Sequence, residues 1–122
     1  MTALLVALGG ALGTLMRYGA NVMFGSSAFP YATFTVNALG SCALALLSQV
    51  IGDRTLWGVP LGLVVGTGVL GGFTTYSSFN LETFRMLQQG QTSLAVFYAG
   101  LTFVTCLALG ALGFAVGVRL MR

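Results

Sequence analysis

Residues 71–80 read Gly71-Gly72-Phe73-Thr74-Thr75-Tyr76-Ser77-Ser78-Phe79-Asn80, and they lie inside a charge-free run from Thr55 to Leu81. A helix that crosses a membrane takes about 20 apolar residues, so this run is long enough. Yet two adjacent glycines are followed by a cluster of hydroxyl side chains, and both features weaken a helix. In lipid, an interrupted helix persists only where its freed backbone groups meet protein, water or an ion. The stretch therefore predicts a broken membrane helix with an ion or substrate site at the break.

The composition predicts one integral membrane domain rather than a soluble protein. Of the 122 residues, 57% are hydrophobic and 6% are charged, whereas soluble domains carry about 25% charged residues. The net charge of +3 is too small, and the arginines too scattered, to indicate a nucleic-acid partner. The chain has no histidine, and Cys42 and Cys106 lie in apolar runs as small buried residues. We do not expect an enzyme.

Four apolar segments predict an all-α membrane fold with four transmembrane helices. The helices are expected at about residues 3–24, 31–51, 57–89 and 92–118 of a single domain that covers residues 1–122. The third segment exceeds one span because a break near 71–75 would make it two half-helices in series. We interpret the first segment as a helix and not as a signal peptide, since no basic residue precedes it.

Small residues recur at four-residue spacing, which lets helices approach closely in lipid. The sets are Gly9 and Gly13, then Gly58, Gly62 and Gly66, then Gly113 and Gly117. Packing within one subunit is the favoured interpretation of each pair, and a contact between subunits is the alternative.

The arginines specify orientation weakly. With four spans, Arg54, Arg119 and Arg122 lie on one side of the membrane, and Arg17 and Arg85 lie towards the other. Such a chain could insert either way up, and two opposite copies could form an antiparallel dimer. Four small helices also enclose little volume for a pore, which favours a dimer independently.

Uncharged polar and aromatic side chains in the membrane predict an anion path. Asn37 is either a contact between helices or an anion ligand, and the two N–H donors of its amide favour the anion ligand slightly. Tyr76 and Phe79 are three residues apart and share a helix face, whereas Ser78 and Glu82 share another. Ring edges carry positive potential, and amides and hydroxyls donate hydrogen bonds. Such weak donors can replace part of an anion's hydration without trapping it.

Arg17 and Glu82 are the charged residues that are costly in a membrane. A structural role is favoured for both, with Glu82 paired to Arg85 one turn along its helix. Arg17 could instead lend positive potential to an aqueous vestibule.

Four stretches form a familiar pattern in their order and spacing: Gly13-Thr14-Leu15-Met16-Arg17-Tyr18, Thr35-Val36-Asn37-Ala38-Leu39-Gly40-Ser41, Gly68-Val69-Leu70 followed by the stretch 71–79, and Ala111-Leu112-Gly113-Phe114. In this pattern the chain resembles, along its whole length, the Fluc (CrcB) family of fluoride channels. It implies an antiparallel, dual-topology homodimer with two fluoride pores in the cytoplasmic (inner) membrane. It also implies passive fluoride export that protects a microbial cell.

The resemblance assigns roles to particular positions. It makes Asn37 the pore asparagine, and it places Tyr76 and Phe79 at the two aromatic positions whose ring edges line the path. The first of these is often Phe, so Tyr76 is a departure that offers a hydroxyl as well as an edge. Ser77 and Ser78 match the hydroxyl track beside the rings.

The remaining assignments concern the fourth helix, a cation and two charged positions. Of Thr102, Thr105 and Cys106, Thr105 is taken as the pore residue. The carbonyls of Gly71 and Thr74 match those that hold a structural sodium ion (Na+) at the dimer interface. Arg17 and Glu82 occupy characteristic family positions in the vestibule or the framework.

The alternatives come from other functional classes. A small proton-coupled multidrug transporter also uses four helices and dual topology, but it needs an acidic residue deep in the membrane. The first helix has none, and Glu82 is the only glutamate. A non-conducting scaffold would explain the glycines but not Asn37 with the hydroxyl cluster.

Overall fold

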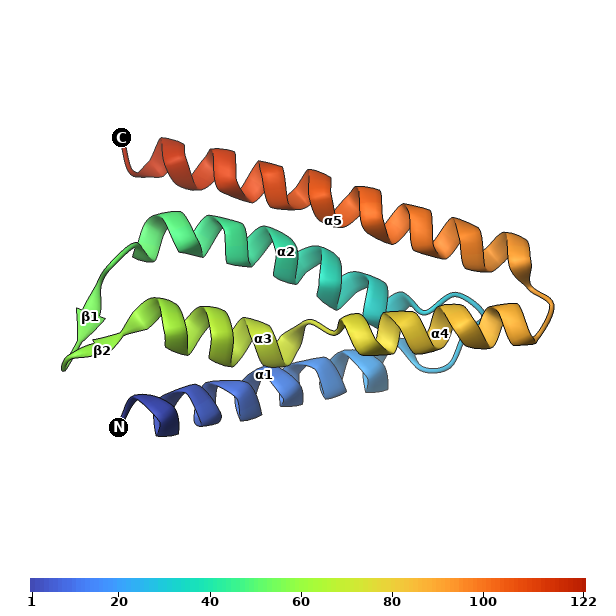
Figure 1. Ribbon diagram of the computed structural model, residues 1–122, viewed down its shortest axis with the longest axis horizontal. Coiled ribbons are helices and arrows are strands. Elements are labelled where there is room, and N and C mark those ends of the chain that lie inside the picture. The colour runs from blue at the N-terminus through green and yellow to red at the C-terminus, as the bar shows by residue number, and fades with distance from the viewer.

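The computed structural model describes residues 1–122, and three long helices form its frame. These are α1 (Thr2–Phe24), α2 (Tyr31–Ile51) and α5 (Thr92–Leu120), each long and apolar enough to cross a membrane. They run side by side with a fourth, interrupted segment (Figure 1). The predicted helical membrane architecture and the bounds of these three helices are confirmed within a few residues.

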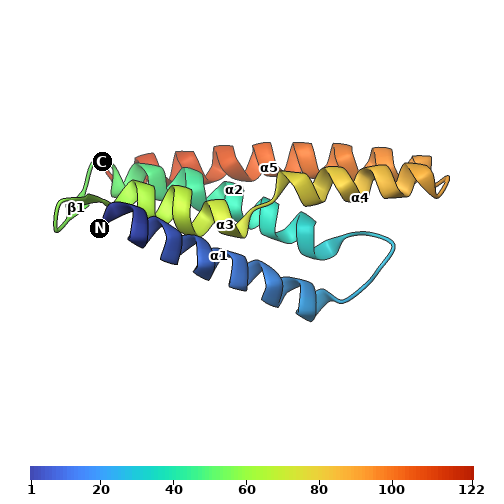
Figure 2. The same ribbon diagram turned by 60° about the horizontal axis from the view of Figure 1, so that its bottom comes forward.

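The interrupted segment consists of η1 (Leu63–Leu70), α3 (Gly71–Phe73) and α4 (Tyr76–Gln88). Between α3 and α4, Thr74 and Thr75 are extended, with φ/ψ of −81°/157° and −153°/108°. Figures 1 and 2 show this stretch as plain chain between two coils. The predicted break is confirmed, but the glycine pair itself stays helical and the chain opens at the two threonines that follow.

Two features of this segment differ from the prediction. First, η1 is a π-helix, in which backbone bonds close over five residues instead of four. Second, regular helix begins only near Leu61, because residues 55–60 form a hairpin of β1 (Thr55–Leu56) and β2 (Val59–Pro60). Trp57 and Gly58 make its turn with φ of 52° and 76°, so Gly58 is a turn glycine and not a helix-packing one.

Glycines on α1 pack directly against the first half of the interrupted segment. A Cβ added at Gly13 would collide with the carbonyl oxygen of Val69 and lie 2.8 Å from the backbone nitrogen of Phe73. One added at Gly72 would collide with the carbonyl oxygen of Gly10. Gly113 and Gly117 lie in the same way against the backbone of α2. The interpretation of Gly9, Gly13, Gly113 and Gly117 as packing sites within the subunit is confirmed.

The second half of the interrupted segment, α4, packs against α5 through side chains. Met86 of α4 and Ala95 and Tyr98 of α5 form a buried cluster, which Phe29, Phe34, Phe79 and Leu94 cover. The outer faces of α1 and α5 carry many exposed large apolar side chains, which suit contact with lipid. The hairpin lies at the same end of the bundle as both chain termini (Figure 1).

Candidate functional site

Asn37 of α2 stabilises the break by hydrogen-bonding the backbone there. Its side-chain oxygen accepts a hydrogen bond from the backbone N–H of Thr75 (2.7 Å), and its amide donates to the carbonyl of Thr75 (3.0 Å). In a continuous helix, the Thr75 N–H would bond the carbonyl of Gly71 instead. Asn37 therefore has the structural role that the sequence left open. Because an amide has two N–H groups, one remains available to a ligand.

Thr75 is the residue that the sequence reasoning missed. It is buried, and its hydroxyl accepts a bond from the backbone N–H of Ser78 (3.1 Å), which caps α4. The same hydroxyl lies 3.0 Å from the Ser78 hydroxyl and 3.3 Å from that of Ser77. A threonine directly before a helix is a common N-cap, and that signal could have identified it.

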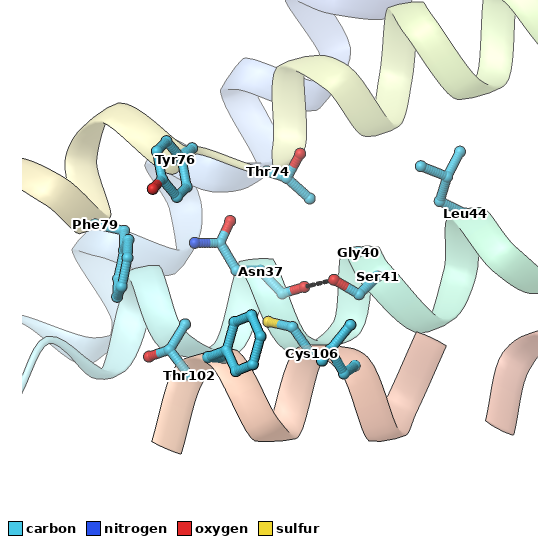
Figure 3. A pocket seen from close by; sticks show the side chains of 11 residues that line it. Asn37, Gly40, Ser41, Leu44, Thr74, Tyr76, Phe79, Thr102 and Cys106 are labelled. Atoms are coloured by element: carbon cyan, nitrogen blue, oxygen red, sulfur yellow. Dashed lines mark hydrogen bonds between the residues drawn. The ribbon is translucent and has the colours of Figure 1, made fainter. Parts of the chain in front are cut away.

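A pocket of about 430 Å³, here called the aromatic pocket, opens beside the break (Figure 3). Its lining residues are Asn37, Gly40, Ser41, Leu44, Thr74, Tyr76, Phe79, Thr102, Phe103, Cys106 and Leu107. The rings of Tyr76 and Phe79 have centroids 5.7 Å apart and planes tilted by 42°. The structure thus brings Asn37 and the two aromatic residues together, and the predicted shared face of Tyr76 and Phe79 is confirmed.

Thr102 of α5 lines the aromatic pocket and has an unpaired hydroxyl, whose oxygen is enclosed by the chain and not exposed in the pocket. The residue is 5% exposed, and its side-chain oxygen has no hydrogen-bond partner in the chain. A buried hydroxyl without a partner is costly, so a ligand that pairs with it would be stabilised. Cys106 lies one turn further along the same pocket (Figure 3). Thr105, the residue chosen from the sequence, lines neither this pocket nor the next, and neither does Ser77.

A second pocket of about 290 Å³, here called the polar pocket, lies on the other side of the break. Its lining residues are Thr14, Arg17, Tyr18, Asn21, Thr33, Thr75, Ser78 and Glu82. The predicted shared face of Ser78 and Glu82 is confirmed, and Arg17 joins them. The consecutive residues Thr74 and Thr75 line different pockets, because an extended backbone points successive side chains to opposite sides.

Glu82 is bound by hydroxyl groups from two other helices. Thr33 of α2 donates to one carboxylate oxygen (2.7 Å), and Tyr98 of α5 donates to the other (2.8 Å). The predicted pairing of Glu82 with Arg85 is therefore wrong, and Arg85 is exposed. Nothing in the sequence pattern could have connected three residues so far apart in the chain.

The carbonyls of Gly71 and Thr74, which were predicted to hold a sodium ion, lie at the break, and the ion itself stays a prediction. The Thr74 carbonyl accepts no hydrogen bond, and Gly71 has lost the Thr75 N–H that a regular helix would give it. Carbonyls freed by an unwound membrane helix are suitable ligands for a sodium ion.

Comparison with known proteins assigns the family. The family model described as "CrcB-like protein, Camphor Resistance (CrcB)" matches residues 4–114. The chain belongs to the CrcB family. This CrcB protein is 42% identical to the "Fluoride-specific ion channel FluC" of Sorangium cellulosum, over 95% of this chain and 94% of the relative. It is 43% identical to a protein of the same name from Thermus thermophilus, over 97% and 96%. It is 34% identical to "Fluoride-specific ion channel FluC 2" of Listeria innocua, over 100% and 95%.

These relatives agree with the three apolar helices, so this CrcB protein is a multi-pass membrane protein. They give no support to the multidrug-transporter alternative. The relatives are named as ion channels.

Proposed function

We propose that this CrcB protein is a fluoride-selective channel that exports fluoride passively across the cytoplasmic membrane. Relatives that cover nearly the whole chain carry that name. The observation that carries the proposal is the aromatic pocket. A spare amide N–H and two aromatic rings converge there beside a broken helix, and Thr102, which has an unpaired hydroxyl, lines the same pocket.

The aromatic pocket suits a small, strongly hydrated anion. Fluoride accepts hydrogen bonds from Asn37 and from the Thr102 hydroxyl, while Tyr76 and Phe79 present edges of positive potential. No charged residue lines the pocket. A cationic ring would hold the ion tightly and would also attract larger halides, whereas uncharged donors let fluoride enter and leave. Tyr76 adds a hydroxyl donor at an aromatic position.

The polar pocket serves as the aqueous approach to the narrow part of the path. Arg17 raises the local potential for an anion, and the hydroxyls of Thr75 and Ser78 lead from it towards the break. Glu82 stays fixed by Thr33 and Tyr98, whose hydroxyl groups stabilise its carboxylate with one hydrogen bond to each oxygen.

The working unit is an antiparallel, dual-topology homodimer with two pores. In it the interrupted segment is a fourth membrane crossing. A single chain leaves extensive apolar faces uncovered, which lipid and a second copy would share. The Thr74 and Gly71 carbonyls of two copies would hold one structural sodium ion, whose charge raises the potential along both pores. This cation explains how the freed carbonyls are stabilised inside a membrane.

Efflux from loaded liposomes tests the function. We expect the purified protein to release fluoride at least a hundredfold faster than chloride, and equal rates would contradict the proposal. Phe79→Ile should lower fluoride efflux tenfold or more, because it removes a ring edge from the path. Phe84→Ile is the matched control, since Phe84 is an exposed residue of the same helix. Equal efflux by both variants would exclude the aromatic pocket as the path.

A further inference from the structure

The hairpin of residues 54–61 contains the only non-glycine residue with positive φ, and that residue is Trp57 (φ 52°). This left-handed conformation is unfavourable for any residue with a Cβ and is an outlier for a bulky one. The two-residue turn imposes this conformation, because hairpins with turns of this length favour positive φ at both turn positions. The Trp57 side chain is 81% exposed, its indole N–H donates no hydrogen bond, and its ring has no aromatic partner. A bulky apolar ring held outward in a strained turn suggests a partner outside the chain.

The hairpin is fixed to the bundle, so the direction of Trp57 is determined. The Leu61 N–H bonds the Arg54 carbonyl (3.0 Å) at its base, and Val59 is buried with 2% exposure. At its tip, Leu56 is exposed beside Trp57. The hairpin projects from the end of the bundle, beyond the start of η1 and the end of α2 (Figures 1 and 2). That end is where the apolar helices finish and the headgroup layer of a bilayer begins.

The charges at this end complement an anionic lipid surface. Arg54 at the base of the hairpin and Arg119 and Arg122 near the chain terminus are exposed, and Asp53 is the one acidic side chain at this end. At the opposite end, Arg85 is the only exposed arginine near the loop that follows α4. Tryptophan has an apolar ring and a polar N–H, which suit the boundary between acyl chains and headgroups.

We propose that the 54–61 hairpin is an interfacial lipid anchor. The Trp57 ring lies at the level of the acyl-chain carbonyls, and Arg54 binds the headgroup of an anionic phospholipid. The favourable transfer of the indole into the interface offsets the strained backbone of the turn. The anchor is independent of fluoride conduction, and it would fix the depth of the α2 and η1 ends in the bilayer.

The chain has one tryptophan, so its intrinsic fluorescence reports the tip of the hairpin without any mutation. The unmodified protein is reconstituted in phosphatidylcholine vesicles that contain lipids brominated either near the carbonyl end or near the middle of the acyl chain. We expect the shallow bromines to quench Trp57 at least twofold more than the deep ones, and aqueous acrylamide to quench it weakly. Strong quenching by acrylamide with none by either lipid would overturn the proposal.

A second arm tests the headgroup. Bromine is placed only on phosphatidylglycerol or only on phosphatidylcholine at equal mole fraction in mixed vesicles. We expect a preference of about two- to fivefold for quenching by the anionic lipid, since one arginine at an anionic surface contributes at most about fivefold. Arg54→Gln should abolish the preference, and Arg85→Gln at the opposite end should keep it. Equal quenching by the two lipids in the unmodified protein would refute the anionic site. Fluoride efflux, measured in parallel, separates this result from the channel proposal.

Discussion

The two halves of the interrupted segment are held by different kinds of contact. Before the break, η1 and α3 meet α1 backbone to backbone, through glycines that leave no room for a side chain. After the break, α4 meets α2 and α5 through rings, hydroxyls and the Glu82 carboxylate. The first half has no side-chain hydrogen bond to α1, whereas the second half has direct ones to both neighbours.

This difference indicates that η1 and α3 have a structural role, whereas α4 carries the side chains that can bind a ligand. Close backbone packing is rigid but chemically featureless, and it fixes where the chain opens. Polar side chains are available to bind a ligand only where other contacts already hold the backbone in place. The break at Thr74 and Thr75 is the boundary, and Asn37 links the two halves because it bonds the backbone there. Substitutions on either side should therefore have separable effects.

The largest effect is expected from Gly13→Ala on the scaffold side. The added Cβ would overlap the Val69 carbonyl oxygen, and only separation of α1 from η1 would relieve the overlap. We expect a destabilisation of about 3 kcal/mol or more, the upper end for overpacked sites, and loss of a monodisperse species on size exclusion. Gly19→Ala is the control on the same helix, since nothing lies within 4 Å of its Cβ position. A Gly13→Ala protein as stable as the control would show that the helices are not in glycine-mediated contact.

An intermediate, mixed effect is expected from Asn37→Ala at the boundary. The change leaves both the N–H and the carbonyl of Thr75 without a partner, at a combined cost of about 2 kcal/mol, the low end for two unsatisfied groups, because Thr75 lines the polar pocket. Fluoride efflux should fall as well, because the spare amide N–H is lost. Thermal unfolding in detergent and efflux measured on the same preparation should both change. Normal efflux with reduced stability would assign Asn37 to the scaffold alone.

The smallest effect on stability is expected from Thr102→Val on the chemical side. The Thr102 hydroxyl has no partner in the chain, so an isosteric apolar side chain costs no hydrogen bond and could raise the unfolding temperature. Efflux should nevertheless fall, by about tenfold if the hydroxyl contributes one hydrogen bond to the ion, worth about 1.4 kcal/mol. Thr105→Val is the matched control on the same helix, outside the lining set. If Thr105→Val lowers efflux and Thr102→Val does not, Thr105 is the pore residue, as the sequence predicted, and the aromatic pocket is not the path.

The sequence predicted features that depend on neighbours along the chain. Helix bounds follow from runs of apolar residues, and the break follows from glycines and hydroxyls in a charge-free run. The shared faces of Tyr76 with Phe79 and of Ser78 with Glu82 follow from helical periodicity. Errors arose where local preference competed with turn geometry. Trp57 and Gly58 extend an apolar run in the sequence, yet they form the turn of a hairpin.

The choice among fourth-helix residues shows the limit of local reasoning. Thr102, Thr105 and Cys106 are chemically similar candidates, and only the rotation of α5 against α2 determines which of them line a pocket. The same is true of Glu82, whose partners lie 49 and 16 residues away in the chain.

The amino-acid sequence alone is enough to place this protein in a membrane, to locate the ends of its long helices and to locate the break in one of them. These properties arise from the transfer of consecutive side chains to lipid and from backbone preferences within a few residues. Only the tertiary structure decided that Asn37 holds the break, that Thr74 and Thr75 line opposite pockets, and that Thr102 keeps an unpaired hydroxyl. Those outcomes depend on how helices distant in the chain are rotated against one another, and glycine contacts fix that rotation only after the chain has folded.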